Sequence, residues 1–174
     1  MSETPKVGIL MGSDSDFPVM EEVFRVLDDF GVPYEARILS AHRSPEESAD
    51  YARQAADRGL KVIIAGAGWA AHLAGVIAAA TVLPVIGVPI DSSPLQGMDS
   101  LLSTVQMPPG IPVATMAIGR GGATNAAVFA VQILATHDAG LAAKLRDFKK
   151  QMAEDVTVKK RKKLEEYLSN RERG

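Results

Sequence analysis

The sequence VGILMGSDSDFPVMEEVFRVL, residues 7–27, decides the fold. It opens with an apolar run, Val7 to Met11, and continues through a loop of small polar residues, Gly12 to Asp16. Apolar side chains then recur at i, i+3, i+4 and i+7, namely at Met20, Val23, Phe24 and Leu27. This succession predicts a buried strand, a loop and a helix whose apolar stripe lies on a sheet.

Four more apolar runs follow, with helical patterns between them: Tyr34 to Leu39, Lys61 to Ala65, Val85 to Val88 and Val113 to Ala117. Strands separated by helices predict a parallel sheet, because parallel neighbours need a crossover connection. The runs are nearly all apolar, which is typical of strands covered on both faces. We therefore expect an α/β fold, a three-layer α/β/α sandwich with a parallel sheet.

Local signals place the remaining helices. The second helix opens with Ser44 as N-cap, Pro45 at the first position and a capping-box glutamate, and Gly59 closes it. Alanine-rich segments near 70–80 and 122–136 have helical spacing, and 99–105 suits a short helix.

The pattern changes near the C-terminus. Beyond Gly140, an apolar stripe from Leu141 to Met152 continues loosely to Leu168, which predicts a long C-terminal helix. We expect one catalytic α/β domain over residues 1–150 and a charged helical extension over 151–174. Part of this helix either packs on another subunit or, beyond Val156, is a frayed polar tail.

Composition excludes several classes of protein. The chain has 174 residues, which suits one domain, and no cysteine. The lack of cysteine excludes disulfide scaffolds, cysteine-ligated metals and thiol catalysis, and it is typical of a reducing compartment. The N-terminal residues lack a signal-peptide pattern, and no run approaches the ~18 apolar residues of a membrane span. We expect a cytoplasmic protein with no membrane partner.

Charge is unevenly distributed. Residues 1–143 hold 8 of the 19 basic and 15 of the 21 acidic side chains. The basic run from Lys159 to Lys163 could bind nucleic acid, but no aromatic residue is interleaved with it and the rest of the chain is acidic. We expect a solvated helix face and no nucleic-acid partner.

The polar residues of the chain gather after the strands. Each of the five runs is followed by a loop of small and polar residues, at 12–16, 40–44, 66–72, 91–94 and 119–125. Ligands of open parallel sheets bind beyond the carboxyl ends of the strands. The sequence therefore predicts that these loops converge on one polar pocket at that edge.

Four of these loops carry residues that suit ligand binding or catalysis. The loop from Gly12 to Asp16 either caps its helix or offers N–H groups and hydroxyls to a phosphate, with Asp16 reaching sugar hydroxyls. In the second loop, Arg43 suits phosphate, and His42 can act as base and acid in turn. In the third loop, Gly66 and Gly68 allow either a tight turn or the close approach of a ligand. The fifth loop adds donors from Arg120, Thr124 and Asn125.

Other histidines and metals give weaker signals. His72 is either a packing residue or a second polar group at the site, and His137 lies near a helix end, where the helix dipole explains it. Asp14 and Asp16 could ligate Mg²⁺, but two carboxylates on one loop are too few to indicate a site, and no HExxH pattern exists. We expect no metal.

Five motifs occur together and in order over roughly residues 5–150: MGSDSD at 11–16, SAHR at 40–43, AGAG with AAHL at 65–68 and 70–73, DSLLS with VQMP at 99–103 and 105–108, and NAA to QIL between 125 and 134. They resemble the N5-carboxyaminoimidazole ribonucleotide mutases, the bacterial-type phosphoribosylaminoimidazole carboxylase catalytic subunit family. The resemblance implies a flavodoxin-like domain in a homo-octamer. It also implies an isomerase of purine biosynthesis that forms 4-carboxy-5-aminoimidazole ribonucleotide by decarboxylation and recarboxylation, without metal or cofactor. A functional link to an ATP-dependent enzyme that carboxylates aminoimidazole ribonucleotide follows from it.

The resemblance also implies residue roles. Ser13 and Arg43 match contacts of the substrate phosphate, Asp16 matches the ribose contact, and Ser15 lines the same loop. His42 matches the proton-transfer residue. Further substrate contacts near the migrating carboxylate match Ser40, Gly68, Trp69 and Ala70.

Two positions depart from the family pattern, with Trp69 in place of a glycine and Ala74 in place of a proline. The Trp69 side chain either reshapes the CO₂ pocket, points outward or enters a subunit interface. Two other functions stay open: a direct CO₂-dependent carboxylase of aminoimidazole ribonucleotide, and a flavin- or nucleotide-binding module on the same fold.

Overall fold

A parallel sheet forms the centre of the protein. The computed structural model describes residues 4–171, and within them five strands pair in the order β2-β1-β3-β4-β5. Their bounds are β1 (Val7–Met11), β2 (Tyr34–Ile38), β3 (Val62–Gly68), β4 (Val85–Ile90) and β5 (Ala114–Thr115). All four pairings are parallel, which confirms the predicted sheet.

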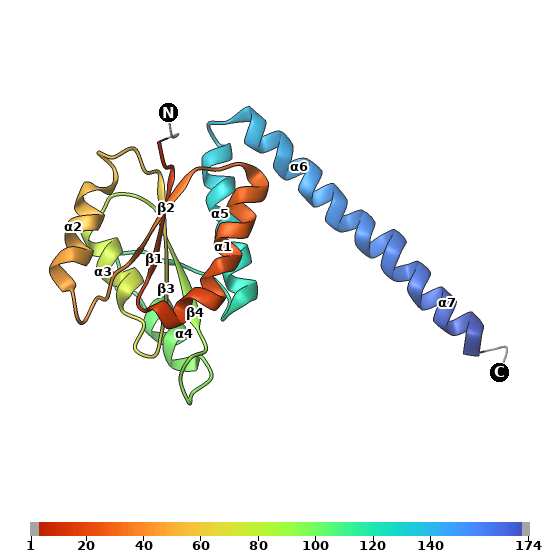
Figure 1. Ribbon diagram of the computed structural model, residues 1–174, viewed down its shortest axis with the longest axis horizontal. Coiled ribbons are helices and arrows are strands. Elements are labelled where there is room, and N and C mark those ends of the chain that lie inside the picture. The colour runs from red at the N-terminus through yellow and green to blue at the C-terminus, as the bar shows by residue number, and fades with distance from the viewer. Residues whose placement is uncertain (1–3, 172–174) are drawn as a thin grey trace. The chain divides into compact units, whose positions relative to one another are not determined.

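Helices cover both faces of the sheet. Figure 1 shows α1 (Phe17–Phe30) and α5 (Arg120–Ala135) on one face and α2 (Pro45–Ala55) and α3 (Leu73–Ala80) on the other. A short helix, α4 (Met98–Val105), packs near β4. The three-layer α/β/α sandwich is confirmed, and its strand order is that of flavodoxin-like folds.

The core lies between the central strands and the helices. Ile9, Ile63 and Ile64 are fully buried, and α1 buries Met20, Val23 and Leu27 against the sheet. Each buried side chain of this kind contributes about 1.5–3 kcal/mol of transfer free energy. The hydrophobic burial that holds the layers together therefore comes largely from the apolar runs of the sequence.

Strand β2 departs from the expectation that strands are covered on both faces. Its residues are half-buried or exposed, and Ile38 is 56% exposed. The reason is its place at the edge of the sheet, where the helices cover the strands less completely than at the centre.

The start of α2 also differs from expectation. Ser44 is the N-cap and Pro45 lies in the first turn, as predicted, but the capping-box prediction is wrong. The Ser44 hydroxyl donates instead to the Ser40 carbonyl oxygen and accepts from the Ser40 N–H, both at 3.2 Å. The helix ends at Ala55, and Gly59, in the left-handed region at φ +98°, closes the turn that follows.

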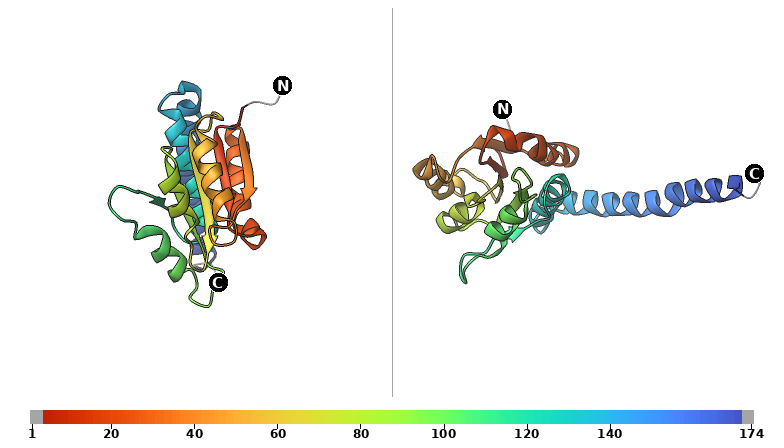
Figure 2. Two further views of the ribbon diagram at one scale, coloured as in Figure 1. Left: turned by 90° about the vertical axis from the view of Figure 1, so that its left-hand side faces the viewer. Right: turned by 90° about the horizontal axis from the view of Figure 1, so that it is seen from below.

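The chain forms two compact units, which divide between Leu134 and Ala135. The second contains α6 (Ala139–Glu154), a π-helical segment (Asp155–Lys160) and α7 (Arg161–Arg171). Figure 2 shows these as one continuous rod, which confirms the predicted long C-terminal helix. No helix within residues 4–171 is both long and apolar enough to cross a membrane.

The packing of α5 predicts opposite effects for two adjacent glycines. A Cβ at Gly122 would overlap the backbone carbonyl of Ala117, whereas a Cβ at Gly121 meets no atom within 4 Å. Gly122→Ala should therefore cost about 1–3 kcal/mol of unfolding free energy, as overpacking typically does. The matched control Gly121→Ala should be neutral or stabilising by up to ~1 kcal/mol, because alanine favours the helix. Urea unfolding of both variants tests this, and equal effects would contradict the packing.

Candidate functional site

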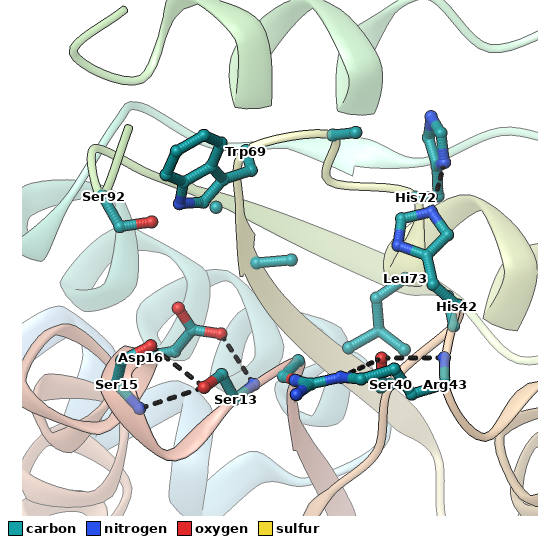
Figure 3. Close-up of a pocket in the computed structure, with 15 residues that line it drawn as sticks. Ser13, Ser15, Asp16, Ser40, His42, Arg43, Trp69, His72, Leu73 and Ser92 are labelled. Atoms are coloured by element: carbon teal, nitrogen blue, oxygen red, sulfur yellow. Dashed lines mark hydrogen bonds between the residues drawn. The ribbon is translucent and has the colours of Figure 1, made fainter. Parts of the chain in front are cut away.

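A cavity of about 420 Å³ lies at the C-terminal edge of the sheet. Figure 3 shows its polar side chains, which come from several loops and face a common space. The lining residues are Gly12, Ser13, Ser15, Asp16, Ser40, Ala41, His42, Arg43, Ala67, Gly68, Trp69, Ala70, His72, Leu73 and Ser92. The predicted polar pocket is therefore present, and every residue to which the family resemblance gives a catalytic role or a substrate contact lines it.

Sheet topology explains the position of the cavity. β1 and β3 are neighbours, yet the helix after β1 covers one face of the sheet and the helix after β3 covers the other (Figure 1). The loops after these strands diverge, and a crevice opens between them. Such a switch in the direction of the connections is where open α/β sheets bind ligands.

The first loop forms a cluster of hydroxyls and N–H groups at the start of α1. The Ser13 hydroxyl accepts from the Ser15 N–H at 3.3 Å, and the Ser13 N–H donates to the Asp16 carboxylate at 3.0 Å. These bonds make a capping box around the short 3-10 helix Asp14–Asp16. Sequence reasoning left open whether this loop caps a helix or binds an anion, and the geometry allows both.

Asp16 is the only acidic side chain among the lining residues. It is 3% exposed, and burial raises the pKa of its carboxyl above the usual range. Hydrogen bonds from the backbone N–H groups of Ser13 and Gly12 act in the opposite direction and limit the rise of that pKa. Asp16 therefore presents an acceptor at the cavity wall that is costly to ionise.

Arg43 links the second loop to the first. Its backbone N–H and its Nε both donate to the Ser40 hydroxyl, at 3.2 and 3.4 Å, and its Nη2 donates to the Gly12 carbonyl oxygen at 3.5 Å. These contacts hold the guanidinium beside the serine cluster. A cation, two hydroxyls and a helix N-terminus at one end of the cavity are groups that favour a bound phosphate.

His42 contacts a second histidine. Its Nε2 lies 2.8 Å from Nδ1 of His72, with the two rings nearly perpendicular at 79°. One nitrogen must donate and the other accept, so the pair holds one proton between these two atoms. The sequence left His72 as either a packing residue or a further polar group at the site, and the structure favours the polar group.

The third loop contributes Gly68, Trp69 and Ala70 to the lining of the cavity. Figure 3 shows the Trp69 indole across the cavity from the serines of the first loop. Trp69 lines the cavity and is 59% exposed, with its backbone in the left-handed region at φ +54°. Ala74, the other residue that departs from the family pattern, is buried in the first turn of α3.

Some predicted groups lie elsewhere. The expectation that the fifth loop joins the pocket is wrong: the Arg120 side chain pairs with Glu21 and Glu22 at 3.3 and 3.2 Å, and Asn125 is exposed. β5 lies at the sheet edge, separated from β1 by two strands, so its loop does not reach the crevice. His137 is exposed just after α5.

Sequence reasoning missed Leu73 and Ser92 as lining residues and left His72 undecided. Two signals could have found them: Leu73 ends the AAHL motif at 70–73, and Ser92 stands in one of the five loops expected to converge. Within residues 4–171 no group of three or more histidine, cysteine, aspartate or glutamate side chains is arranged to hold a metal ion.

The sheet order and the cavity at its switch point define a flavodoxin-like α/β protein with a polar small-molecule site. The family described as AIR carboxylase matches residues 6–155. The chain belongs to this family.

Curated relatives and a solved structure agree with this assignment. The chain is 59% identical to an N5-carboxyaminoimidazole ribonucleotide mutase of Pyrococcus horikoshii, over 97% of this chain and 96% of the relative. It is 54% identical to the mutase of Mycobacterium leprae, over 91% and 92%. The crystal structure of a Treponema denticola PurE2 variant superposes with a TM-score of 0.82 at 28% identity, covering 92% of this chain and 98% of that one.

The raised pKa of Asp16 predicts a dependence of stability on pH. Because folding raises the pKa of this carboxyl, its contribution to stability is greatest at low pH, where it is protonated, and is lost as pH rises through the folded-state pKa. Asp16→Asn keeps an oxygen for the Ser13 N–H and removes the charge. The variant should therefore unfold at the same or a higher temperature than the parent at pH 7, with the difference shrinking toward pH 4.

Thermal unfolding of both proteins between pH 4 and pH 8 measures this difference. Strong destabilisation of Asp16→Asn at pH 7 would show that the carboxylate stabilises the loop as an ion, contrary to this prediction.

Proposed function

We propose that the chain is an isomerase of purine biosynthesis that converts N5-carboxyaminoimidazole ribonucleotide to 4-carboxy-5-aminoimidazole ribonucleotide. The observation that carries the proposal is the joint presence, in one cavity, of a phosphate-suited cluster around Ser13 and Arg43 and a histidine pair, His42 and His72. The names of the relatives support the same reaction.

In the proposed complex the substrate spans the cavity. Its phosphate binds Ser13 and Arg43, with Ser15 on the same loop, and its ribose hydroxyls donate to Asp16. These contacts anchor the part of the molecule that does not react. The ring then extends toward His42, and the migrating carboxylate lies near Ser40 and the backbone from Gly68 to Ala70.

The reaction needs two proton transfers. As the N–CO₂ bond breaks, a proton is delivered to the departing nitrogen, and CO₂ and aminoimidazole ribonucleotide are held together. C4 of the ring then attacks CO₂, a C–C bond forms, and the proton on C4 is removed. His42 donates the first proton as an acid and accepts the second as a base, so the residue ends in the state in which it began.

The contact with His72 supports this double role. When His42 Nε2 carries the shared proton it donates to His72, and when His72 Nδ1 carries it His42 is left as the acceptor. Nε2 of His42 is a donor in the first arrangement and an acceptor in the second, the two roles that the proton transfers require of it. His72 thus keeps either form hydrogen-bonded before substrate arrives.

The steps require positioning and proton transfer, which the named side chains supply without metal or cofactor. As part of the proposal, residues 1–150 are the catalytic domain and 151–174 a helical extension. The protein works in the cytoplasm as a homo-octamer, and receives its substrate from an ATP-dependent enzyme that carboxylates aminoimidazole ribonucleotide.

A direct carboxylase that joins CO₂ to aminoimidazole ribonucleotide is the second candidate, because the matching family is described by that activity. Both functions use the same cavity. Assays with each precursor, N5-carboxyaminoimidazole ribonucleotide and aminoimidazole ribonucleotide plus bicarbonate, separate them. The proposal predicts that the first precursor is used far more efficiently, and preference for the second would establish the carboxylase.

His42→Asn should abolish most of the activity, because asparagine cannot transfer the proton. General acid and base catalysis typically contributes 10²–10⁴-fold, so kcat should fall at least 100-fold. The matched control is His137→Asn, which alters an exposed histidine outside the lining set and should leave turnover unchanged. Near-normal turnover of a folded His42→Asn enzyme would refute the role of His42.

Arg43→Gln should weaken binding without slowing chemistry. The phosphate does not take part in the reaction, so its contacts stabilise ground and transition states alike. We expect KM to rise about tenfold, which corresponds to one charged hydrogen bond, with kcat changed less than threefold. Arg53→Gln, on the exposed face of α2 where Arg53 pairs with Asp50, is the control. A drop in kcat at unchanged KM would place the phosphate elsewhere.

A further inference from the structure

Trp69, the only tryptophan of the chain, lines the cavity with 59% of its surface exposed. Figure 3 shows its indole across the cavity from Ser13, Ser15 and Asp16. We propose that the indole stacks on the planar ring of the bound ribonucleotide and covers it from water. The inference rests on the proposed function, because it requires a ligand with a heteroaromatic ring.

The fold holds Trp69 in an unfavourable backbone conformation. A bulky residue rarely adopts a φ of +54°, which glycine adopts without steric conflict. Before it, Gly68 pairs with Ile90 in the sheet and lies so close to Ser92 that a Cβ would overlap the serine hydroxyl. After it, the His72 N–H donates to the Ala70 carbonyl oxygen at 2.8 Å. The backbone is therefore held in place both before and after Trp69.

Packing within the chain does not account for this side chain. A tryptophan that stabilises a core is largely covered by other side chains. Nearby Leu73 is covered in this way and is 2% exposed, whereas Trp69 leaves more than half of its surface open. The strained backbone thus presents an aromatic face to the cavity. Such a face, among a few convergent polar groups, is typical of sites that bind planar ligands.

The other lining residues indicate where the ring of the bound ribonucleotide lies. With the phosphate at Ser13 and Arg43 and the sugar at Asp16, the ring extends into the space between His42 and Trp69, which lie on opposite sides in Figure 3. Stacking uses the ring face and leaves its edge free for His42. Covering the face also slows the escape of CO₂ while it is detached from the ring.

The fluorescence of the single tryptophan reports this contact directly. The product, 4-carboxy-5-aminoimidazole ribonucleotide, should change the emission of Trp69 on binding. Ribose 5-phosphate carries the same phosphate and sugar without the ring, and it should bind, by calorimetry, without changing the emission. Unchanged emission while calorimetry records binding of the product overturns the inference and leaves the proposed function intact. Absence of binding by both compounds overturns the proposed function, and the ring contact with it.

Substitutions give a second test. Trp69→Gly suits the left-handed backbone, so it should fold, and it should weaken binding of the product about tenfold, a typical value for one aromatic contact. Binding of ribose 5-phosphate should not change. Trp69→Phe should lose less affinity than Trp69→Gly, because phenylalanine keeps a stacking face.

The matched control is Gln96→Gly. In the described part of the chain, Gln96 is the other non-glycine residue with a positive φ, which is 51°. Gln96 does not line the cavity, so this variant relieves a similar strain and should bind the product like the parent. Equal weakening of both compounds by Trp69→Gly overturns the stacking contact. A changed assembly size with unchanged affinity for the product also overturns it, since Trp69 would then be an interface residue.

Discussion

The parallel pairing of β1 with β3 is the constraint on which the rest of the structure depends. The register pairs Val7 with Val62 and Met11 with Gly66, so the two strands reach the same edge of the sheet side by side. There the Gly12 N–H donates to the Gly66 carbonyl oxygen at 3.1 Å. The loops that follow must start side by side, and because their helices cover opposite faces, a crevice opens between them. The serines, the histidine pair and Trp69 all occupy this crevice.

Much of this arrangement could be predicted from the residues. Apolar runs such as Val7 to Met11 mark buried strands, because the burial of their side chains is the main source of stability. Polar loops after these runs indicate the edge at which a ligand binds. The resemblance of MGSDSD and SAHR to a known family named six residues that all line the cavity: Ser13, Ser15, Asp16, Ser40, His42 and Arg43. The family match and the fold comparison confirm the membership.

The features that the sequence did not predict depend on the order of the strands in the sheet and on small differences in free energy between alternative hydrogen bonds. Sequence does not state the strand order, so all five loops were expected to meet, whereas β5 at the sheet edge carries Arg120 away from the crevice. The same order brings His72 to His42, thirty positions apart in the chain. The capping box forms at Ser13 and Asp16 rather than at Ser44, whose hydroxyl instead bonds the Ser40 backbone. These alternatives differ by about one hydrogen bond, or ~1 kcal/mol, which pattern alone does not resolve.

A crystal structure of the protein with 4-carboxy-5-aminoimidazole ribonucleotide tests the central claim, that one crevice binds the whole substrate in a single orientation, most directly. The account predicts the phosphate against Ser13 and Arg43, the ribose on Asp16, and the ring between Trp69 and His42, with the C4 carboxylate toward Gly68 to Ala70. A nucleotide bound outside the crevice, or in the crevice with its phosphate at the histidine pair, would contradict it.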